Sequence, residues 1–282
     1  MIHYFFTDLF FEVSGISLLE EPFFAPFHAA PDRAPNSLVS ASWVPSLALP
    51  GEKPVYVSET GLCVYLENGA EHRFLRDFFT GQVRTHLIDA AGEKSLLAVG
   101  EPVQPFRELE LLNSLGLEKT MSEHGRWILH ASFIETDQGA ILFTAPSQTG
   151  KSTQAALWEK HRGVRVINGD RAGLWRAGES WMAGGVPWSG TSGICLSCSM
   201  PLRAIVLLSQ GPQNMTYTIP FPAKVARLLE QTTINPWNRE MLLAAQLFWM
   251  ELCKEIPVIG LSCLSDEGAV DTLEKELKRY GK

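Results

Sequence analysis

The segment at residues 145–152, which ends in Gly-Lys-Ser, constrains the fold of this chain more than any other feature. An apolar run, Ala140–Thr144, precedes it and predicts a buried strand. Helical spacing from Ser152 to Arg162, ended by Gly163, predicts a helix after it. A loop of this kind between a strand and a helix is the context in which it binds phosphate. We therefore expect its backbone N–H groups to form a concave anion site at a helix N-terminus.

The residue types of this loop fit the polyphosphate of a nucleotide, ATP with Mg²⁺. Gly150 has no Cβ and lets the backbone approach a phosphate. Lys151 supplies a positive charge to the β- and γ-phosphates, and the Ser152 hydroxyl can bind magnesium. Ala145 stands where a glycine is usual, and a positive φ there would cost about 1 kcal/mol. The predicted nucleotide-binding residues of the segment are Ala145, Pro146, Ser147, Gln148, Thr149, Gly150, Lys151, Ser152 and Thr153.

Composition is typical of an ordinary globular protein. The 282 residues, 45% of them hydrophobic, are enough for one large domain or two smaller ones. A formal net charge of -7 predicts no binding to nucleic acid or to an anionic membrane surface. No apolar run approaches the roughly 20 residues of a membrane span, and the first residues lack the basic part of a secretory signal. The five cysteines show no framework spacing, so we expect a reduced, cytoplasmic protein.

The first part of the chain, residues 1–104, differs in pattern from the rest. Short β-type runs alternate with turn pairs such as Asn68-Gly69 and Ala91-Gly92. Asn-Gly between β-type runs is a strong hairpin signal, because both residues tolerate a positive φ. We expect a small antiparallel β-rich domain here, suited to docking a partner or a peptide.

The second part, residues 105–282, begins with a helical run at Phe106–Leu117 and ends with a helix expected over Glu267–Lys282. One hairpin precedes the 145–152 loop and another follows Asp170, whereas a doubly wound domain opens with the strand of its phosphate loop. The expected fold class is therefore α/β, with a mixed sheet.

Two polar residues flank the loop in the sequence. Asp170 follows the β-type run Val164–Ile167, and a carboxylate at a strand end can hold magnesium or accept a proton from a hydroxyl. The sequence Asn-Gly-Asp is also ordinary turn chemistry. His130 lies in the strand expected ahead of the loop strand, where a lone histidine is more often a core residue than a functional one.

Two other motifs allow more than one interpretation. The glycine-rich stretch Gly184–Gly193 could close over phosphates as a lid or form an irregular connection. Cys195-x-x-Cys198 has the spacing of half a metal site, but no second pair accompanies it, and structural zinc requires four ligands. We interpret these cysteines as two ordinary thiols.

From about His124 onward the chain resembles a known family. The block His-Ala-Ser, a hairpin, a short apolar strand, Ser-x-x-Gly-Lys-Ser-Thr, a helix and then an acidic turn resembles the C-terminal domain of HPr kinase/phosphorylase. That domain has the phosphoenolpyruvate carboxykinase-like P-loop fold. The segment Thr144–Trp158 is especially similar to HPr kinase-related proteins of anaerobic bacteria. The first hundred or so residues do not resemble the N-terminal domain of the true HPr kinases.

The resemblance implies ATP-dependent phosphorylation of a hydroxyl, typically of a serine on a protein. It matches Lys151 and Ser152 to the phosphate loop of the family. His130 matches a histidine that reaches the phosphates, and Asp170 matches the second acid of an Asp-Asp pair. The implied catalytic residues are thus Asp170, His130 and Lys151, and the implied metal ligands are Ser152 and Asp170.

Two positions qualify the resemblance. Gly169 stands where the family has the first acid of its pair, although the family divides base and magnesium duties between the two acids. Arg203 resembles a basic residue that lies near the phosphates. No segment matches the loop that the family uses for phosphorolysis, so phosphorolysis is not predicted.

The function predicted from the sequence is transfer of the γ-phosphate of ATP to a hydroxyl, on a serine or threonine of a peptide or small protein. A small-molecule acceptor is one alternative, since the phosphate machinery is common to both. A second alternative is a regulatory module that binds ATP and transfers nothing. A decarboxylating carboxykinase is the least favoured. A homo-oligomer is compatible with the sequence, which does not define the oligomeric state.

Overall fold

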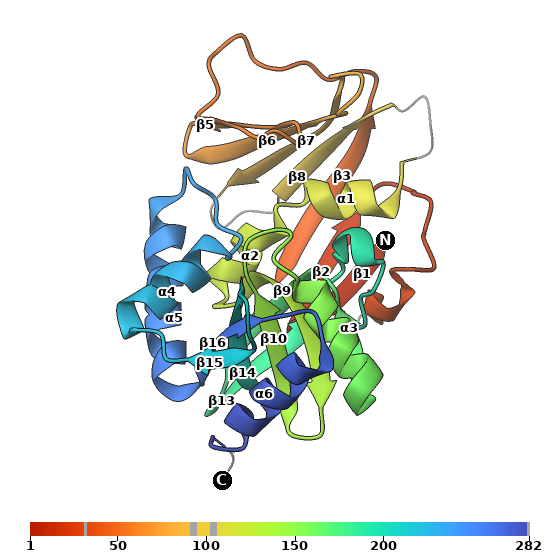
Figure 1. Ribbon diagram of the computed structural model, residues 1–282. Coiled ribbons are helices and arrows are strands. Elements are labelled where there is room, and N and C mark those ends of the chain that lie inside the picture. The colour runs from red at the N-terminus through yellow and green to blue at the C-terminus, as the bar shows by residue number, and fades with distance from the viewer. Residues whose placement is uncertain (31–32, 91–94, 102–105, 281–282) are drawn as a thin grey trace. The chain divides into compact units, whose positions relative to one another are not determined.

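The computed structural model describes residues 1–30, 33–90, 95–101 and 106–280. The chain divides into two compact units, Met1–Thr120 and Met121–Lys282 (Figure 1). The boundary expected between residues 104 and 105 and the turn at Ala91-Gly92 lie outside the described residues.

The first unit is built around an eight-stranded sheet in the order β1-β2-β3-β8-β7-β6-β5-β4. Its elements are β1 (Ile2–Phe6), β2 (Leu9–Ser14), η1 (Ala25–Phe27), β3 (Ser37–Val44), β4 (Tyr56–Val57), β5 (Leu62–Glu67), β6 (Ala70–Arg76), β7 (Val83–Ala90), β8 (Ser95–Gly100) and α1 (Glu108–Ser114).

This sheet is mixed, so the expectation of a purely antiparallel domain is wrong. The hairpin at Asn68-Gly69 is as predicted, with φ values of +51° and +79° between the antiparallel strands β5 and β6. However, β3 runs parallel to both β2 and β8. A long connection returns the chain between β2 and β3, and β8 reaches β3 only after the hairpins from β4 to β7, so local turn signals do not reveal these pairings.

The helix expected over Phe106–Leu117 is two short helices, α1 and α2 (Leu117–Glu123). Gly116 separates them with a φ of +59°, a conformation that favours glycine. A Cβ at this position would lie 2.7 Å from Nη1 of Arg73. The Arg73 guanidinium is buried and forms ion pairs with Glu71 and Glu118. The break therefore gives a buried ion-pair network the room it needs.

We predict that Gly116→Ala destabilises the protein more than Gly81→Ala. Both glycines have a positive φ, so each alanine should cost about 1 kcal/mol of unfolding free energy. Only the Cβ at residue 116 meets another group within 4 Å, so crowding should add about 1 kcal/mol there. Urea unfolding measures both variants, and equal losses would contradict the crowding argument.

The second unit carries another eight-stranded mixed sheet. Its elements are β9 (Trp127–Thr136), β10 (Gly139–Thr144), α3 (Lys151–Arg162), β11 (Arg165–Asn168), β12 (Arg171–Ala177), β13 (Ser180–Gly185), η2 (Gly190–Ser192), β14 (Ser199–Gln210), β15 (Met215–Tyr217), α4 (Phe221–Glu230), α5 (Arg239–Glu255), β16 (Val258–Cys263) and α6 (Glu267–Leu277). The order is β10-β9-β12-β13-β14-β16-β15, with β11 beside β9 and a further pairing between β10 and β14. The predicted mixed sheet is confirmed, and α6 ends earlier than expected.

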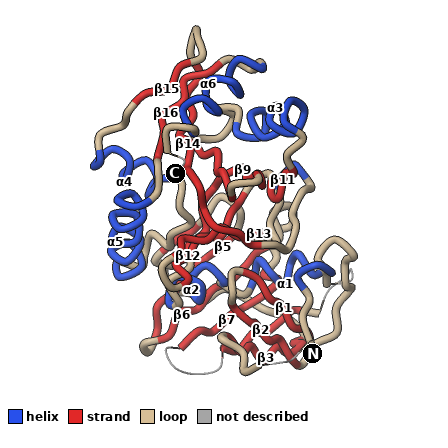
Figure 2. Tube along the Cα trace, turned by 90° about the horizontal axis from the view of Figure 1, so that it is seen from below, coloured by secondary structure: helices blue, strands red, loops and turns tan. Residues whose placement is uncertain are grey.

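Strand β10 is buried on both faces. Leu142 belongs to a core that includes Leu228 of α4 and Trp249 of α5. Its neighbour Phe143 belongs to a second core that includes Trp158 of α3. Figure 2 shows α4 and α5 together on one side of the strands, and α3 and α6 on the other. The apolar run preceding the 145–152 loop is therefore continuous because both of its faces are covered.

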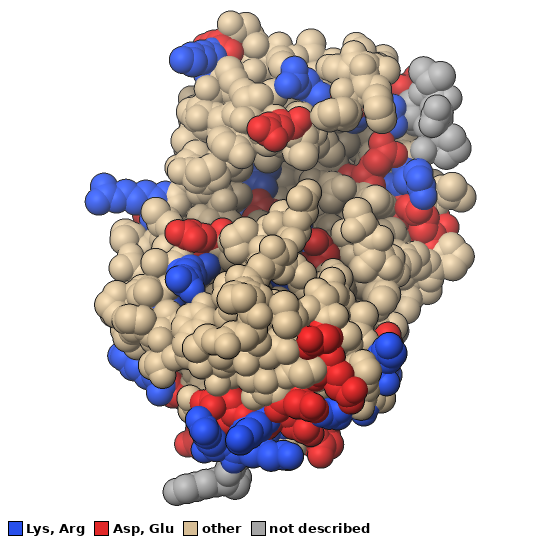
Figure 3. All heavy atoms as spheres, viewed as in Figure 1, with Lys and Arg blue, Asp and Glu red and all other residues tan. Residues whose placement is uncertain are grey.

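The surface of this unit carries both signs of charge. In Figure 3 positive and negative side chains are interspersed around the end of the unit where α6 and the C-terminus lie. None of the helices in the described ranges has the length and apolarity needed to cross a bilayer.

Candidate functional site

The 145–152 loop connects the end of β10 to the first turn of α3, as the sequence predicts. Gly150 precedes the helix with a φ of +108°, and Gln148 has a φ of +64°. Ala145 does not have a positive φ, and its side chain is buried in the core beneath α3. Alanine at the usual glycine position is therefore not strained, and the positive φ falls on Gln148 instead.

Lys151 is buried at the mouth of this loop, with only 6% of the residue exposed. Its ammonium donates to the carbonyl oxygens of Ala145 at 2.9 Å and Pro146 at 3.3 Å. Burial lowers the pKa of Lys151, and the charge of Asp170 partly opposes this shift. Within the described residues Lys151 forms no ion pair, so an anion entering the loop would stabilise a cation that now has only neutral partners.

The turn after β11 is organised by the side chain of Asn168, which is fully buried. Its Oδ1 accepts hydrogen bonds from the backbone N–H groups of Asp170 and Arg171, both at 2.9 Å. Its Nδ2 donates to the carbonyl oxygens of Val186 at 3.0 Å and Trp188 at 2.9 Å. One amide therefore fixes both the backbone that carries Asp170 and the start of the glycine-rich segment.

The Asp170 carboxylate lies between two basic side chains. Oδ1 is 3.4 Å from Nε2 of His130 on β9, and Oδ2 is 3.3 Å from Nε of Arg171. The hydrogen bond with His130 is the largest influence holding the pKa of Asp170 below its ordinary value; burial opposes it and Arg171 adds to it. The structure thus brings Asp170 and His130 together and keeps the carboxylate ionised near neutral pH.

The carbonyl oxygen of Gly169 joins the turn to two other elements. It accepts a hydrogen bond from Oγ of Ser132 on β9 at 2.9 Å. It also accepts one from Oγ of Ser152 at the start of α3, at 3.4 Å. The Ser152 hydroxyl therefore contacts the residue that directly precedes Asp170 in the chain. The two predicted metal ligands therefore flank a single peptide group.

The segment 189–193 packs directly on this turn. A Cβ at Gly169 would lie 2.2 Å from Oγ and 2.4 Å from Cβ of Ser192. A Cβ at Gly190 would lie 2.6 Å from the carboxyl carbon of Asp170. Residue 169 is thus a glycine because Ser192 fills the space that its side chain would need, and the glycine-rich stretch lies against the acid.

An open pocket of about 570 Å³ adjoins the loop. Its lining residues come from the loop, the end of β14, β15 and α4, and they are Ala145, Pro146, Ser147, Gln148, Thr149, Leu207, Leu208, Ser209, Gln210, Tyr217, Arg227, Glu230 and Gln231. Five residues of the predicted phosphate-binding loop, residues 145–149, therefore form part of the wall of this pocket.

Arg203 is not brought to this loop. It lies near the start of β14, where the neighbouring residues Leu202 and Ala204 pair with Ala140 and Ile141 of β10. Because β10 and β14 are parallel, the start of β14 lies at the opposite end of β10 from the loop that follows Thr144. The resemblance that placed Arg203 near the phosphates is corrected on this point.

Several residues of the site were missed from the sequence. The sequence indicates Asn168 only as a turn residue and assigns no individual role to Ser132, Gly190 or Ser192. Asn168 carried a detectable signal, since Asn and Asp stabilise turns by bonding to backbone N–H groups two residues ahead. Within the described ranges no three His, Cys, Asp or Glu residues cluster as a metal site.

The comparisons with known proteins give a distant likeness. No protein-family model and no curated protein sequence matches the chain. A solved structure entitled "Structure of the Hpr(Ser) kinase/phosphatase from Coxiella burnetii" aligns with 55% of this chain and 99% of its own. The identity is 16% and the TM-score is 0.31.

We predict that Gly169→Ala destabilises the protein by about 1–3 kcal/mol, because the new methyl group would overlap Ser192. In the double variant with Ser192→Gly, which removes the overlapping atoms, most of this loss should be recovered. Thermal or urea unfolding of the two single variants and the double variant tests this. A simple sum of the single-variant losses would contradict the packing described here.

We also predict that His130→Ala raises the pKa of Asp170 toward its ordinary value, because the variant removes the hydrogen bond that most lowers it. A carboxyl with a lowered pKa stabilises the fold above its unfolded pKa, and this contribution is lost as pH falls through the folded pKa. The carboxyl carbon of Asp170, followed by NMR during acid titration, reports the shift. His161→Ala serves as control, and an unchanged Asp170 titration in His130→Ala would contradict the assignment.

Proposed function

We propose that the protein is a kinase that transfers the γ-phosphate of ATP to a hydroxyl on a serine or threonine of a peptide or small protein. One observation carries this proposal: Lys151 is buried at a helix N-terminus, forms no ion pair among the described residues, and lies close to a carboxylate that is held ionised. Such a pairing of an anion site and a proton acceptor suits phosphoryl transfer.

In this proposal, the β- and γ-phosphates accept hydrogen bonds from the backbone N–H groups of the loop and from Lys151. For this the ammonium of Lys151 would leave the carbonyl oxygens of Ala145 and Pro146. The nucleoside would extend into the adjoining pocket, where Tyr217, Arg227 and Gln231 are available to contact it. The adjoining pocket continues beyond the groups that would bind phosphate. This favours a nucleotide over a simple phosphate as the ligand.

The donors around Gly169 fit Mg²⁺. Ser152 provides a hydroxyl and Asp170 a carboxylate, which are hard oxygen ligands. Magnesium in kinases is typically held by one or two protein ligands together with phosphate oxygens and water. Bound there, the ion would neutralise charge on the phosphates.

The reaction itself would depend on Asp170 and His130. Asp170, ionised near neutral pH, accepts the proton of the acceptor hydroxyl as its oxygen bonds to the γ-phosphorus, and the bond from that phosphorus to the β,γ-bridging oxygen breaks to release ADP. His130 contacts the transferring phosphate and orients the carboxylate through their mutual contact. Lys151 stabilises the negative charge that develops on the phosphate oxygens.

The acceptor and the setting belong to the same proposal. The β-rich first unit would dock the peptide or small protein, and the reaction would take place in the cytoplasm without nucleic acid or a membrane. A homo-oligomer is compatible with this scheme.

One observation favours a second candidate, an ATP-binding regulatory module without transfer. Ser192 fills the space beside Gly169, so a second acid cannot be accommodated at that position in this conformation. If phosphoryl transfer requires two carboxylates, the site would bind the nucleotide and stop there.

Incubation with γ-labelled ATP, Mg²⁺ and candidate peptides or lysate separates these candidates. We expect label on a protein or peptide, with the rate reduced at least about a hundredfold in Lys151→Ala and in Asp170→Asn. Lys160→Ala, which changes an exposed lysine at the other end of α3, should be unaffected. Label on a metabolite alone would overturn the protein acceptor, and binding without transfer to any acceptor would favour the regulatory module.

A further inference from the structure

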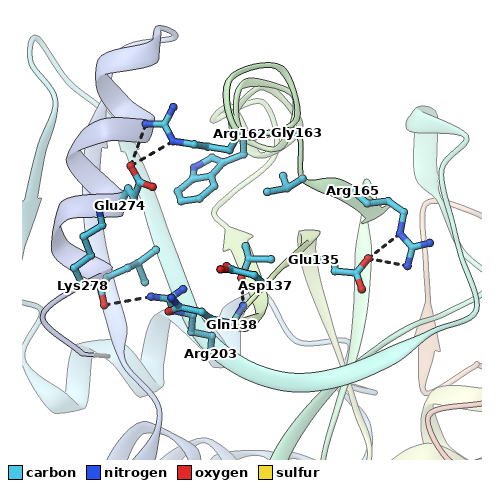
Figure 4. Close-up of a pocket in the computed structure, with 13 residues that line it drawn as sticks. Glu135, Asp137, Gln138, Arg162, Gly163, Arg165, Arg203, Glu274 and Lys278 are labelled. Atoms are coloured by element: carbon cyan, nitrogen blue, oxygen red, sulfur yellow. Dashed lines mark hydrogen bonds and ion pairs between the residues drawn. The ribbon is translucent and has the colours of Figure 1, made fainter. Parts of the chain in front are cut away.

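A second pocket, of about 760 Å³, lies at the end of the second unit away from the 145–152 loop. It is lined by the turn between β9 and β10, the end of α3 and the start of β11. Arg203 of β14 and the end of α6 complete it (Figure 4). Helix α3 separates the two places: its first residue, Lys151, belongs to the loop, and its last, Arg162, lines the pocket. A helix of 12 residues is about 18 Å long.

Two of the four basic side chains in this pocket are neutralised. Arg162 forms ion pairs with Asp271 and with Glu274, the latter at 3.1 Å. Arg165 pairs with Glu135 at 2.7 Å. Figure 4 shows these two pairs on opposite sides of the opening. Because Arg162 and Arg165 are paired in this way, they offer little positive charge to a ligand.

The other two basic side chains are available. Arg203 is partly buried, and among the described residues its guanidinium makes one long hydrogen bond, at 3.5 Å, to the carbonyl oxygen of Leu277. Lys278 is exposed and forms no ion pair within the described residues. Asp137 also lines the pocket, and no ion pair involving it occurs in that part of the chain. The net charge of Arg203, Lys278 and Asp137 together is therefore +1.

Trp158 adds an unsatisfied donor. It lines the pocket, is 4% exposed, and packs against Phe143 with ring centroids 6.4 Å apart. Its Nε1 is buried and has no hydrogen-bond partner among the described residues. An indole N–H can only donate, and most buried donors in native proteins have an acceptor. Trp158 therefore contributes a largely buried aromatic ring to the pocket lining, beside the guanidinium of Arg203 and the ammonium of Lys278.

We propose that this pocket binds a small organic monocarboxylate. The carboxylate accepts hydrogen bonds from the Arg203 guanidinium and lies near Lys278. The apolar part of the ligand packs against the side chains of Trp158, Val164 and Leu277. A single negative charge matches the net charge of the unpaired groups, whereas a dianion would leave one negative charge uncompensated near Asp137.

The test uses the full-length chain labelled with ¹⁵N and titrated with benzoate. The indole N–H resonance of Trp158 is identified by its loss in Trp158→Phe. We expect a saturable shift of this resonance, and no shift with benzamide, which has the same shape without the charge. The absence of a saturable shift with benzoate, or an equal shift with benzamide, would overturn the proposal.

Variants locate the binding groups. Arg203→Gln should weaken benzoate binding at least about tenfold, since a hydrogen bond to a charged group is lost. Lys278→Gln, at an exposed position where folding is not at risk, should weaken it about threefold. Lys275→Gln changes an exposed lysine on the same helix outside the pocket and should leave the affinity unchanged.

The nucleotide site is distinguished with Lys151→Ala, in which benzoate should bind as in the unmodified chain. Loss of binding in Lys151→Ala would place the ligand at the 145–152 loop and overturn the proposal. Unchanged binding in both Arg203→Gln and Lys278→Gln would also overturn it. None of these readouts depends on phosphoryl transfer, so failure of the kinase proposal would leave this test intact.

Discussion

The structure of the second unit depends on the burial of β10 from both faces. Its side chains enter two separate cores, and its edges pair with β9 and β14. A strand held in this way has little freedom of position, so the point at which the chain leaves it for the 145–152 loop is fixed. The loop then needs only Gln148 and Gly150 with positive φ to reach the start of α3.

The peptide group at Gly169 connects this rigid frame to the chemistry. Its carbonyl oxygen joins β9 through Ser132 and α3 through Ser152, and the next residue is Asp170. Asn168 holds the same turn to the glycine-rich segment, so the acid and the segment packed upon it form one unit. Lys151 remains close to this group and is buried, and its hydrogen-bond partners in the described part of the chain are neutral carbonyl oxygens. An arrangement of fixed donors beside an ionised carboxylate is preorganised for an anion rather than formed on binding.

The sequence predicted the features that depend on local physics. The strand before the loop, α3 with its glycine at residue 163, and the hairpin at Asn68-Gly69 all follow from periodicity and turn chemistry. The parallel pairs around β3, the crowding of Gly169 by Ser192 and the position of Arg203 join residues distant in the chain. No local pattern encodes such contacts, and a resemblance at one strand does not fix which end of the sheet a residue occupies.

The buried charge of Lys151 is the group through which we propose that the 145–152 loop binds a nucleotide. Calorimetric titration of the full-length chain with Mg·ADP measures this without requiring an acceptor. We expect saturable binding of one nucleotide per chain, weakened at least about tenfold in Lys151→Ala. Absence of saturable binding, or undiminished affinity in Lys151→Ala, would contradict it.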